Sequence, residues 1–237
     1  MKPACELCAK YKRMKEHSMK RAIVLSGGNI DRSTAMRLLE IEKPDLVIAA
    51  DRGLAFCDAC GIRPDAIVGD FDSLEHAQTL VERYRAMGIP IEEYRPEKDM
   101  TDTDIALEKA VAAGATDIFF LGATGTRLDH TLSNIFNLYK LRQRGITGVI
   151  VDANNRITMP CGKKIQMKRS EQYGRYLSFF AFNGAVTGLT LRGLKYPLDH
   201  AVLRPADGGL AVSNEFAEET AEITYEDGVL IIMETRD

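Results

Sequence analysis

The sequence predicts an α/β fold in which a parallel sheet carries helices on both faces and is followed by an all-β region. Up to about residue 155, short apolar segments typical of strands alternate with segments of helical pattern. The apolar segments are nearly uninterrupted, as in strands buried on both faces of a parallel sheet. After about residue 156 the helical patterns stop, and short β-prone segments follow one another.

Each predicted strand is an apolar run that ends in small or acidic residues. The predicted strands are residues 21–28, 45–51, 64–73, 89–95, 116–125 and 148–155. Helices are expected between them, where apolar and charged residues mix and a glycine often follows, as Gly61 and Gly114 do. The predicted helices are STAMRLLEIEK, GLAFCDAC, residues 75–87, residues 101–114 and LDHTLSNIFNLYKLRQRG.

The rest of the chain contains β-prone segments such as YLSFFAF, GLTLRGL and AEITYEDGVLIIMET. Within the last of these, Asp227-Gly228 has the residue types of a tight hairpin turn. We therefore divide the chain into an N-terminal extension (1–18), an α/β domain (19–155) and an all-β domain (156–237).

The composition is that of a soluble globular protein, with 45% hydrophobic and 27% charged residues among 237. A net charge of −3 argues against general nucleic-acid binding. No apolar run reaches the roughly 18 residues of a membrane span. The basic N-terminus also lacks the apolar stretch of a secretory signal. We expect a cytoplasmic protein that binds neither nucleic acid nor membrane.

Glycines and polar residues gather where the predicted strands end. In a parallel sheet these carboxyl ends share one edge, which is where ligands bind. Four strands contribute, so we expect one site built from separate parts of the chain. The residues are Ser26, Gly27 and Gly28 after the first strand, Asp51 after the second, Asp70 and Asp72 after the third, and 122–130 after the fifth.

The segment VGDFDSL places two carboxylates, Asp70 and Asp72, two residues apart. If the strand geometry continues, both point to one side, where they would repel each other unless a cation lies between them. Mg²⁺ suits such oxygen ligands. The alternative is a loop in which Asp72 or Ser73 caps the next helix.

Three more carboxylates, Asp99, Asp102 and Asp104, lie at the start of the fourth predicted helix. Thr101 and Asp104 have the spacing of a capping box, so part of this cluster could be structural. Three acids exceed what one cap needs, and residues 65–104 hold eleven acidic against four basic residues. Mg²⁺ bound to phosphates would use one or two of these acids directly.

The segment GATGTRLDH lies at a strand-to-helix junction. Gly122 and Gly125 allow close backbone approach, and amides at a helix start can bind phosphate oxygens. Arg127 can bind phosphate with two hydrogen bonds, Asp129 can face a metal or a hydroxyl, and His130 adds a proton-sensitive donor. An ion pair between Arg127 and Asp129 is the competing structural interpretation. The P-loop sequence and the protein-kinase motifs are missing, so a nucleotide-using enzyme would be of another type.

Four of the five cysteines form two C-x-x-C pairs, Cys5 with Cys8 and Cys57 with Cys60. This spacing is typical of a structural zinc site with four thiolates. The alternative is ordinary packing, because cysteines three residues apart on a helix often only fill the core.

Four motifs together resemble the thiamine pyrophosphokinase family. AADRG, PDAIVGDFDS, KDMTDTDIAL and GATGTRLDHTLSN occur in that family's order and at its spacing, and VSNEF resembles its short Ser-Asn motif. The resemblance implies a Rossmann-like nucleotide-binding domain and a β-sandwich, in a homodimer with active sites at the subunit interface. It also implies Mg²⁺-dependent transfer of a pyrophosphoryl group from ATP to the hydroxyethyl oxygen of thiamine, giving thiamine diphosphate and AMP.

The resemblance also implies roles for individual residues. The acids that hold Mg²⁺ or position the hydroxyl would be Asp70, Asp72, Asp99 and Asp102, with Asp102 or Asp72 as the general base. The nucleotide would be bound by Ser26, Gly27, Gly28, Asp51, Thr124, Gly125, Arg127 and His130, with Asp129 as a further catalytic acid near the phosphates. Ser213 and Asn214 would contact thiamine across the dimer.

The chain departs from the family pattern in two places. It contains no Trp, which some members place beside the thiamine ring, so Phe216 or a Tyr would cover the cationic thiazolium. Residues 1–18 precede the usual start of the family.

Two other functions stay open at this point. In a haloacid-dehalogenase-type phosphatase Asp70 would form an aspartyl phosphate, but the motif at residues 127–130 would have no role. In a non-catalytic sensor of thiamine or nucleotide, five retained acids would have little use.

Overall fold

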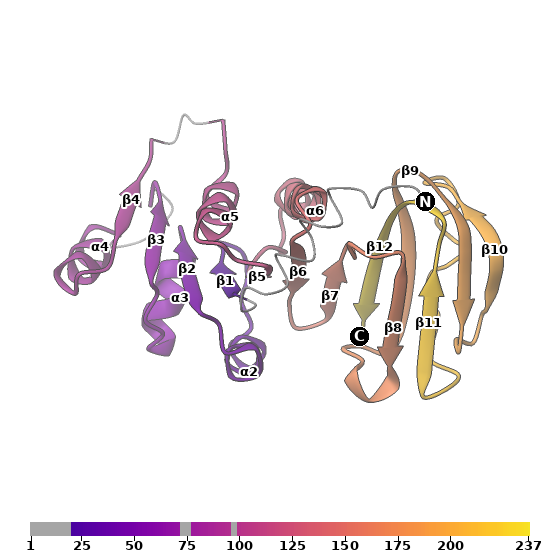
Figure 1. Ribbon diagram of the computed structural model, residues 1–237. Helices are drawn as coiled ribbons and strands as arrows, with labels where there is room; N and C mark the ends of the chain where they lie inside the picture. Colours follow the sequence, from indigo (N-terminus) through magenta and orange to yellow (C-terminus); the bar gives the residue numbers. More distant parts are fainter. Residues whose placement is uncertain (1–19, 72–76, 96–98) are drawn as a thin grey trace, which may run out of the picture.

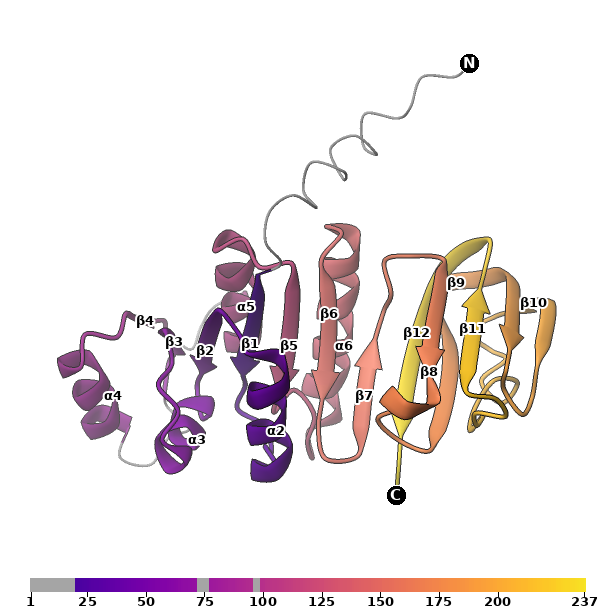
Figure 2. The same ribbon diagram turned by 60° about the horizontal axis from the view of Figure 1, so that its bottom comes forward.

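The computed structural model describes residues 20–71, 77–95 and 99–237. Within these residues, eleven of twelve strands form one hydrogen-bonded path that runs across the molecule, and the twelfth, β10, pairs with β9 beside it (Figure 1, Figure 2). The N-terminal extension, Asp72 and Ser73 lie outside the described residues.

The first part of the sheet is parallel, as predicted. Its strand order is β4-β3-β2-β1-β5-β6, so the order reverses at β1, which pairs with both β2 and β5. Such a reversal opens a crevice at the carboxyl ends of the strands, where α/β proteins bind ligands. The strands are β1 (Arg21–Leu25), β2 (Leu46–Ala50), β3 (Ala66–Gly69), β4 (Ile91–Glu93), β5 (Asp117–Leu121) and β6 (Thr147–Val151).

Helices cover both faces of this sheet (Figure 1). On one face α5 and α6 enclose a core with Leu107, Phe120 and Leu138. On the other face α2, α3 and α4 pack around Leu54 and Ile67. The helices are α2 (Arg32–Glu42), α3 (Gly53–Cys60), α4 (Ala77–Ala86), α5 (Asp102–Ala112) and α6 (Leu128–Gln143).

The C-terminal part is rich in strands, and it surrounds a third core that includes Leu177, Leu191 and Leu230. Its 17-residue strand β9 pairs through its first half with β12 and through its second half with β10 and β11. The elements are β7 (Asn155–Thr158), β8 (Lys164–Lys168), the 3₁₀ helix η1 (Arg169–Glu171), β9 (Tyr176–Arg192), β10 (Leu198–Leu203), β11 (Thr220–Thr224) and β12 (Asp227–Thr235). The predicted α/β fold with a strand-rich C-terminal part is thus confirmed.

The two parts share one sheet. Ile157 of β7 pairs with Ile150 of β6 on one side and with Met233 of β12 on the other. The hydrogen-bonded path therefore continues across residue 155, where we predicted a domain boundary. The division into domains stays a prediction. Across the described residues, no helix combines the length and the apolar character that crossing a bilayer requires.

The hairpin predicted at Asp227-Gly228 is wrong. The two residues begin β12, and this strand pairs with β7 and β9 rather than with β11. The long strand β9 provides the reason, because its two halves offer separate edges and β11 and β12 each pair with a different one.

Candidate active site

A cavity of about 920 Å³ opens at the carboxyl edge of the parallel strands. Its size is that of a pocket for a nucleotide-sized ligand. It is lined by residues that follow β1, β2, β3 and β5 and by the first turns of α5 and α6, so the structure brings together most of the predicted site. The predicted residues that line it are Ser26, Gly27, Gly28, Asp51, Asp70, Asp99, Asp102, Thr124, Gly125, Arg127 and His130.

Two glycine turns pack backbone against backbone on the floor of this pocket. The N–H of Gly28 donates to the carbonyl of Gly122 over 2.9 Å, and a Cβ on Gly28 would lie 2.3 Å from that oxygen. Gly122 has φ +68° and also lies against the backbone of Ser26. Glycine is therefore required here for the approach of β1 and β5, and the N–H of Gly28 serves the fold.

The chain turns sharply after β2 and β3. Asp51 and Phe71 both have positive φ, 50° and 57°. The carboxylate of Asp51 lies beside Gly27, where an added Cβ would be 3.0 Å from Oδ2. Phe71 is 6% exposed and packs in the core, so the strand geometry expected to continue through Asp70 ends at Gly69. Strained backbone of this kind is often found at functional sites.

The start of α5 combines a cap with pocket residues. Thr101 is the N-cap, and its hydroxyl accepts a hydrogen bond from the N–H of Asp104 over 3.1 Å. Asp104 returns the bond, which confirms the capping box. Burial opposes the ionisation of Asp104, but hydrogen bonds from Lys140 and Thr101 outweigh it, so its pKa lies below the usual value. Of the acids predicted to gather here, Asp104 is the structural one, whereas Asp99 and Asp102 line the pocket.

Two hydroxyl contacts hold the pocket floor in place. The Thr103 hydroxyl donates to that of Ser26 over 3.0 Å, and both side chains are buried. The Thr124 hydroxyl donates to Asp152 Oδ2 over 2.7 Å. The hydroxyl protons of Thr103 and Thr124 are thus engaged within the fold.

The beginning of α6 carries the residues that the sequence placed at the strand-to-helix junction. Arg127 Nη2 lies 2.6 Å from Asp129 Oδ2, so the ion pair left open by the sequence is present. The pKa of Asp129 is lowered, mainly by the hydrogen bond from Arg127. Arg127 and His130 line the pocket, but Asp129 lies outside the lining. A catalytic role for Asp129 rests on the resemblance alone.

Sequence reasoning missed several lining residues. Arg52, the N-cap residue of α3, adds a second guanidinium to the pocket and follows Asp51 directly. Asn134 lies four residues after His130 on the same face of α6, and its amide donates to the carbonyl of Ala123 over 2.8 Å. Helical spacing from His130 was the signal that could have found Asn134.

The described residues contain no group of three or more His, Cys, Asp or Glu close enough together to hold a metal ion. Within them, Asp51, Asp70, Asp99 and Asp102 supply the carboxylates of the pocket. Each is a hard ligand that suits Mg²⁺.

The cysteine pair on α3 favours the packing interpretation. Cys57 is fully buried in the core between α3 and the sheet, and burial raises the pKa of its thiol to about 12. Zinc binds the thiolate, which this environment disfavours. Cys60 is partly exposed, and the other pair of the predicted zinc site, Cys5 and Cys8, lies outside the described residues.

The two residues predicted to contact thiamine lie in a turn of the C-terminal part, outside the pocket lining. Ser213 is exposed with φ +57°. Asn214 is 1% exposed, and its side chain bonds to the N–H and carbonyl of Tyr196 and to the N–H of Glu215. Phe216 is 7% exposed within the C-terminal core, so it is not placed to cover a ligand of this protomer.

The fold and the pocket define an α/β protein with a nucleotide-sized pocket at the carboxyl edge of its sheet. The family model "Thiamin pyrophosphokinase, catalytic domain" matches residues 38–150, and "Thiamin pyrophosphokinase, vitamin B1 binding domain" matches residues 163–230. The chain is 33% identical over 192 residues to thiamine pyrophosphokinase of Bacillus subtilis (strain 168), which covers 81% of this chain and 88% of that protein. The chain belongs to the thiamine pyrophosphokinase family.

Solved structures agree with this assignment. A crystal structure of thiamine pyrophosphokinase from Bacillus subtilis has a TM-score of 0.81 and 30% identity, over 92% of this chain and all of that one. The yeast thiamin pyrophosphokinase structure has a TM-score of 0.76 at 17% identity, over 94% of this chain and 89% of that one. The second comparison supports the fold alone.

Proposed function

We propose that this chain transfers the pyrophosphoryl group of ATP to the hydroxyethyl oxygen of thiamine, giving thiamine diphosphate and AMP. Family membership supports the substrates. The observation that carries the proposal is the pocket itself, where two arginines and the start of a helix meet four carboxylates, those of Asp51, Asp70, Asp99 and Asp102, in one cavity. Such a combination suits a phosphate chain on one side and a hydroxyl that loses its proton on the other.

The phosphates of ATP would lie between the glycine turns and the start of α6. Arg52 and Arg127 reach the pocket from opposite sides of the β1–β5 crevice, one after β2 and the other after β5. Guanidinium groups bind phosphate with paired hydrogen bonds, and the positive end of α6 adds to the attraction. In this arrangement Arg127 exchanges its contact with Asp129 for a phosphate.

The transfer step is a substitution at the β-phosphorus of ATP. The hydroxyethyl oxygen of thiamine forms a bond to this phosphorus, and the bond from the phosphorus to the oxygen shared with the α-phosphate breaks. AMP leaves with that oxygen, and the hydroxyl proton passes to a carboxylate. Asp102 fits the role of acceptor among the described residues because it lies in the pocket at the first position of α5.

Mg²⁺ belongs to the same proposal. One or two of Asp70, Asp99 and Asp102 would hold it, since the three do not form a ready-made cluster, and the resemblance adds Asp72. An ion that is already bound to phosphates needs only one or two protein carboxylates. When bound, it neutralises charge on the transferred group.

We also propose a homodimer in which a second copy covers the pocket edge. Leu128, Leu132 and Phe136 form an exposed apolar stripe along α6, with 76%, 52% and 46% of their surfaces accessible. The stripe begins next to Arg127, and the Phe136 ring meets Phe182 of β9 at 5.5 Å. An apolar face of this kind is typical of a subunit interface. A Leu132→Glu variant that stays monomeric in light scattering, against a dimeric wild type, would support it, whereas a monomeric wild type would refute it.

Thiamine would reach the site from the C-terminal part of the partner. Tyr196 is 56% exposed, and its backbone is held by the side chain of Asn214. Lys195 Nζ lies 5.4 Å from the centroid of the Tyr196 ring, so this ring already attracts a cation, and a thiazolium ring would replace the ammonium or use the other face. The cytoplasmic location expected from the sequence stays a prediction.

The test is an incubation of the protein with ATP, Mg²⁺ and thiamine, followed by chromatography of the products. AMP and thiamine diphosphate in equal amounts are expected. ADP with thiamine monophosphate would overturn the pyrophosphoryl transfer. Free phosphate without a thiamine product would indicate a phosphatase, and binding without turnover would indicate a sensor.

A further inference from the structure

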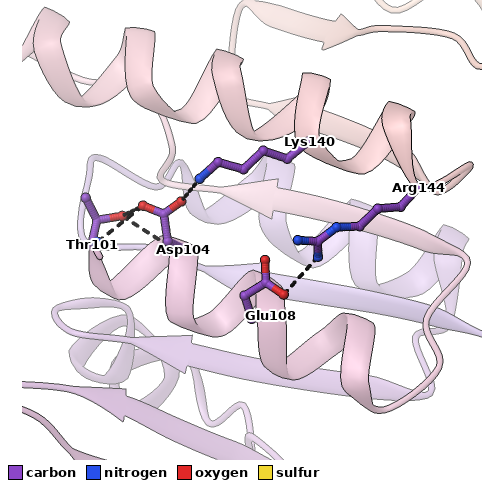
Figure 3. A network of polar contacts seen from close by, with 5 residues as sticks. All are labelled: Thr101, Asp104, Glu108, Lys140 and Arg144. Carbon is purple, nitrogen blue, oxygen red and sulfur yellow. Dashed lines mark hydrogen bonds and ion pairs between the residues drawn. The ribbon is translucent and has the colours of Figure 1, made fainter. Parts of the chain in front are cut away.

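Two ion pairs join helices α5 and α6 on one face of the sheet (Figure 3). Lys140 Nζ lies 2.6 Å from Asp104 Oδ1, and Arg144 Nη1 lies 2.8 Å from Glu108 Oε2. The two acids are four residues apart, as are the two bases, so the pairs are successive rungs between the helices. We name the Asp104–Lys140 pair the inner rung and the Glu108–Arg144 pair the outer rung.

The acid of the inner rung also holds the cap of α5. While Asp104 Oδ1 accepts from Lys140, Oδ2 accepts from the hydroxyl of Thr101 over 2.6 Å and from its backbone N–H over 3.2 Å. One carboxylate therefore joins α6 to the cap, as Figure 3 shows. Thr101 and Asp102, which follows it in the chain, both line the pocket.

The outer rung connects the same helices farther from the pocket. Glu108 and Arg144 are each 41% exposed, and neither lines the cavity. The Asp104 side chain, by contrast, is only 9% exposed. An exposed pair contributes little to stability, whereas a buried carboxylate needs its partners to remain charged in place. The outer rung is thus a matched control for the inner one.

We propose that Lys140 is a positioning residue for the transfer reaction: through Asp104 it fixes the cap of α5 and thereby the placement of Asp102 in the pocket. The inference rests on the proposed function, because Asp102 is assigned to the reaction there. Lys140 itself lies outside the pocket lining, and its ion pair is with Asp104.

Loss of the ammonium group would leave the Asp104 carboxylate buried with Thr101 as its remaining hydrogen-bond partner. The carboxylate would then turn toward water, and its bonds to Thr101 would weaken. Because Asp102 is the first residue of the helix, any loosening of the cap displaces its side chain directly. A displacement of about 1 Å can cost about a hundredfold in rate.

The experiment compares Lys140→Met with Lys140→Arg and with the control Arg144→Met. In each variant we would measure kcat, the KM values for ATP and thiamine, Tm, and deuterium exchange at the amides of residues 101–105. Lys140→Met is expected to lower kcat about tenfold with little change in either KM, and to speed exchange at the cap. Lys140→Arg is expected to keep kcat and exchange at the cap near their wild-type values. Arg144→Met should leave kcat within about twofold of the wild type and exchange at the cap unchanged.

A Lys140→Met protein that keeps the wild-type kcat and wild-type exchange at the cap, with only a lower Tm, would overturn the inference. Equal effects of Lys140→Met and Arg144→Met would do the same. If Lys140→Met does not fold, Asp104→Asn replaces it, since the amide oxygen still accepts from Thr101 while the charge is lost. A wild-type protein without transferase activity would refute the proposed function, and exchange at the cap would then decide the role of Lys140 by itself.

Discussion

The pocket edge of the parallel sheet and the turn around Asn214 are both built from polar residues, but the fold uses them differently. At the pocket edge, Asp102 and Arg127 face a cavity of about 920 Å³. In the turn, the Asn214 amide makes three hydrogen bonds to backbone groups and is almost completely buried. Hydrogen-bond pairing between strands stops at the end of a parallel strand, and the side chains that follow line the cavity. In an irregular turn, backbone N–H and carbonyl groups lack partners in a neighbouring strand, so a buried side chain must form their hydrogen bonds.

The largest expected effect tests the pocket side of this comparison. Asp102→Asn keeps the shape of the side chain and removes a proton acceptor, so kcat should fall by about 10²–10⁴. Tm should stay near that of the wild type, because the carboxylate of Asp102 does not form the capping box. Steady-state kinetics and thermal unfolding of the same samples measure both.

Glu108→Gln is the control for this change, since it alters an acid of the same helix outside the pocket. It should leave kcat close to the wild-type value. An Asp102→Asn variant that loses its fold would show that the acid is structural, and the difference between the two regions would disappear.

A smaller effect tests the turn. Asn214→Ala removes three hydrogen bonds and leaves buried groups unpaired, so the free energy of unfolding should fall by about 2–4 kcal/mol. Ser213→Gly should leave the stability nearly unchanged, because glycine tolerates the positive φ of this position. Urea titration measures both changes.

The same two variants distinguish an effect on protein stability from an effect on thiamine binding. Ser213→Gly should raise the KM for thiamine if this exposed residue contacts the substrate of the dimer. A pattern in which Asn214→Ala changes the thiamine KM but not the stability would contradict the structural role of Asn214.

The smallest effect concerns an acid at a helix start outside the pocket. Asp31 caps α2 through the N–H of Thr34, and a hydrogen bond from the Ser33 hydroxyl is the main cause that lowers its pKa to about 2. An acid with a lowered pKa stabilises the folded state above its unfolded pKa, near 3.8, and loses this contribution as the pH falls toward 2.

Asp31→Asn keeps a good cap but cannot titrate. The Tm of the wild type, measured against the Tm of this variant, should therefore fall as the pH is lowered from 4 to about 2. Above pH 4 the difference between the two Tm values should be constant. Activity should not change. A Tm difference that stays constant from pH 2 upward would mean that the hydrogen bonds of the cap do not lower the pKa of Asp31.

The sequence predicted the parallel sheet, its helices and most of the pocket. Apolar runs such as those before Ser26 and Asp51 bury on both faces, and residues that follow such strands must meet at one edge because the strands are parallel. Asp70, Asp102, Arg127 and His130 were found in this way, since each follows directly from its place after a strand or at a helix start.

Other assignments depended on which atoms meet in space. From the sequence, Asp102 and Asp104 belonged to one acidic cluster in which Asp104 had the spacing of a capping box, but only packing of α5 against α6 decided that Asp104 also faces Lys140. Likewise the choice of Asn214 as a contact for thiamine ignored the backbone of Tyr196, which lies 18 residues away in the chain.

The sequence by itself thus determined the alternation of strands and helices and the chemistry gathered at one edge, because burial and strand direction follow from local patterns. Tertiary structure alone decided which polar groups face the cavity. Asn214 and Asp104 are held inside the fold by a backbone segment and by a charge that lie far away in the chain, and such partners are brought near only by folding.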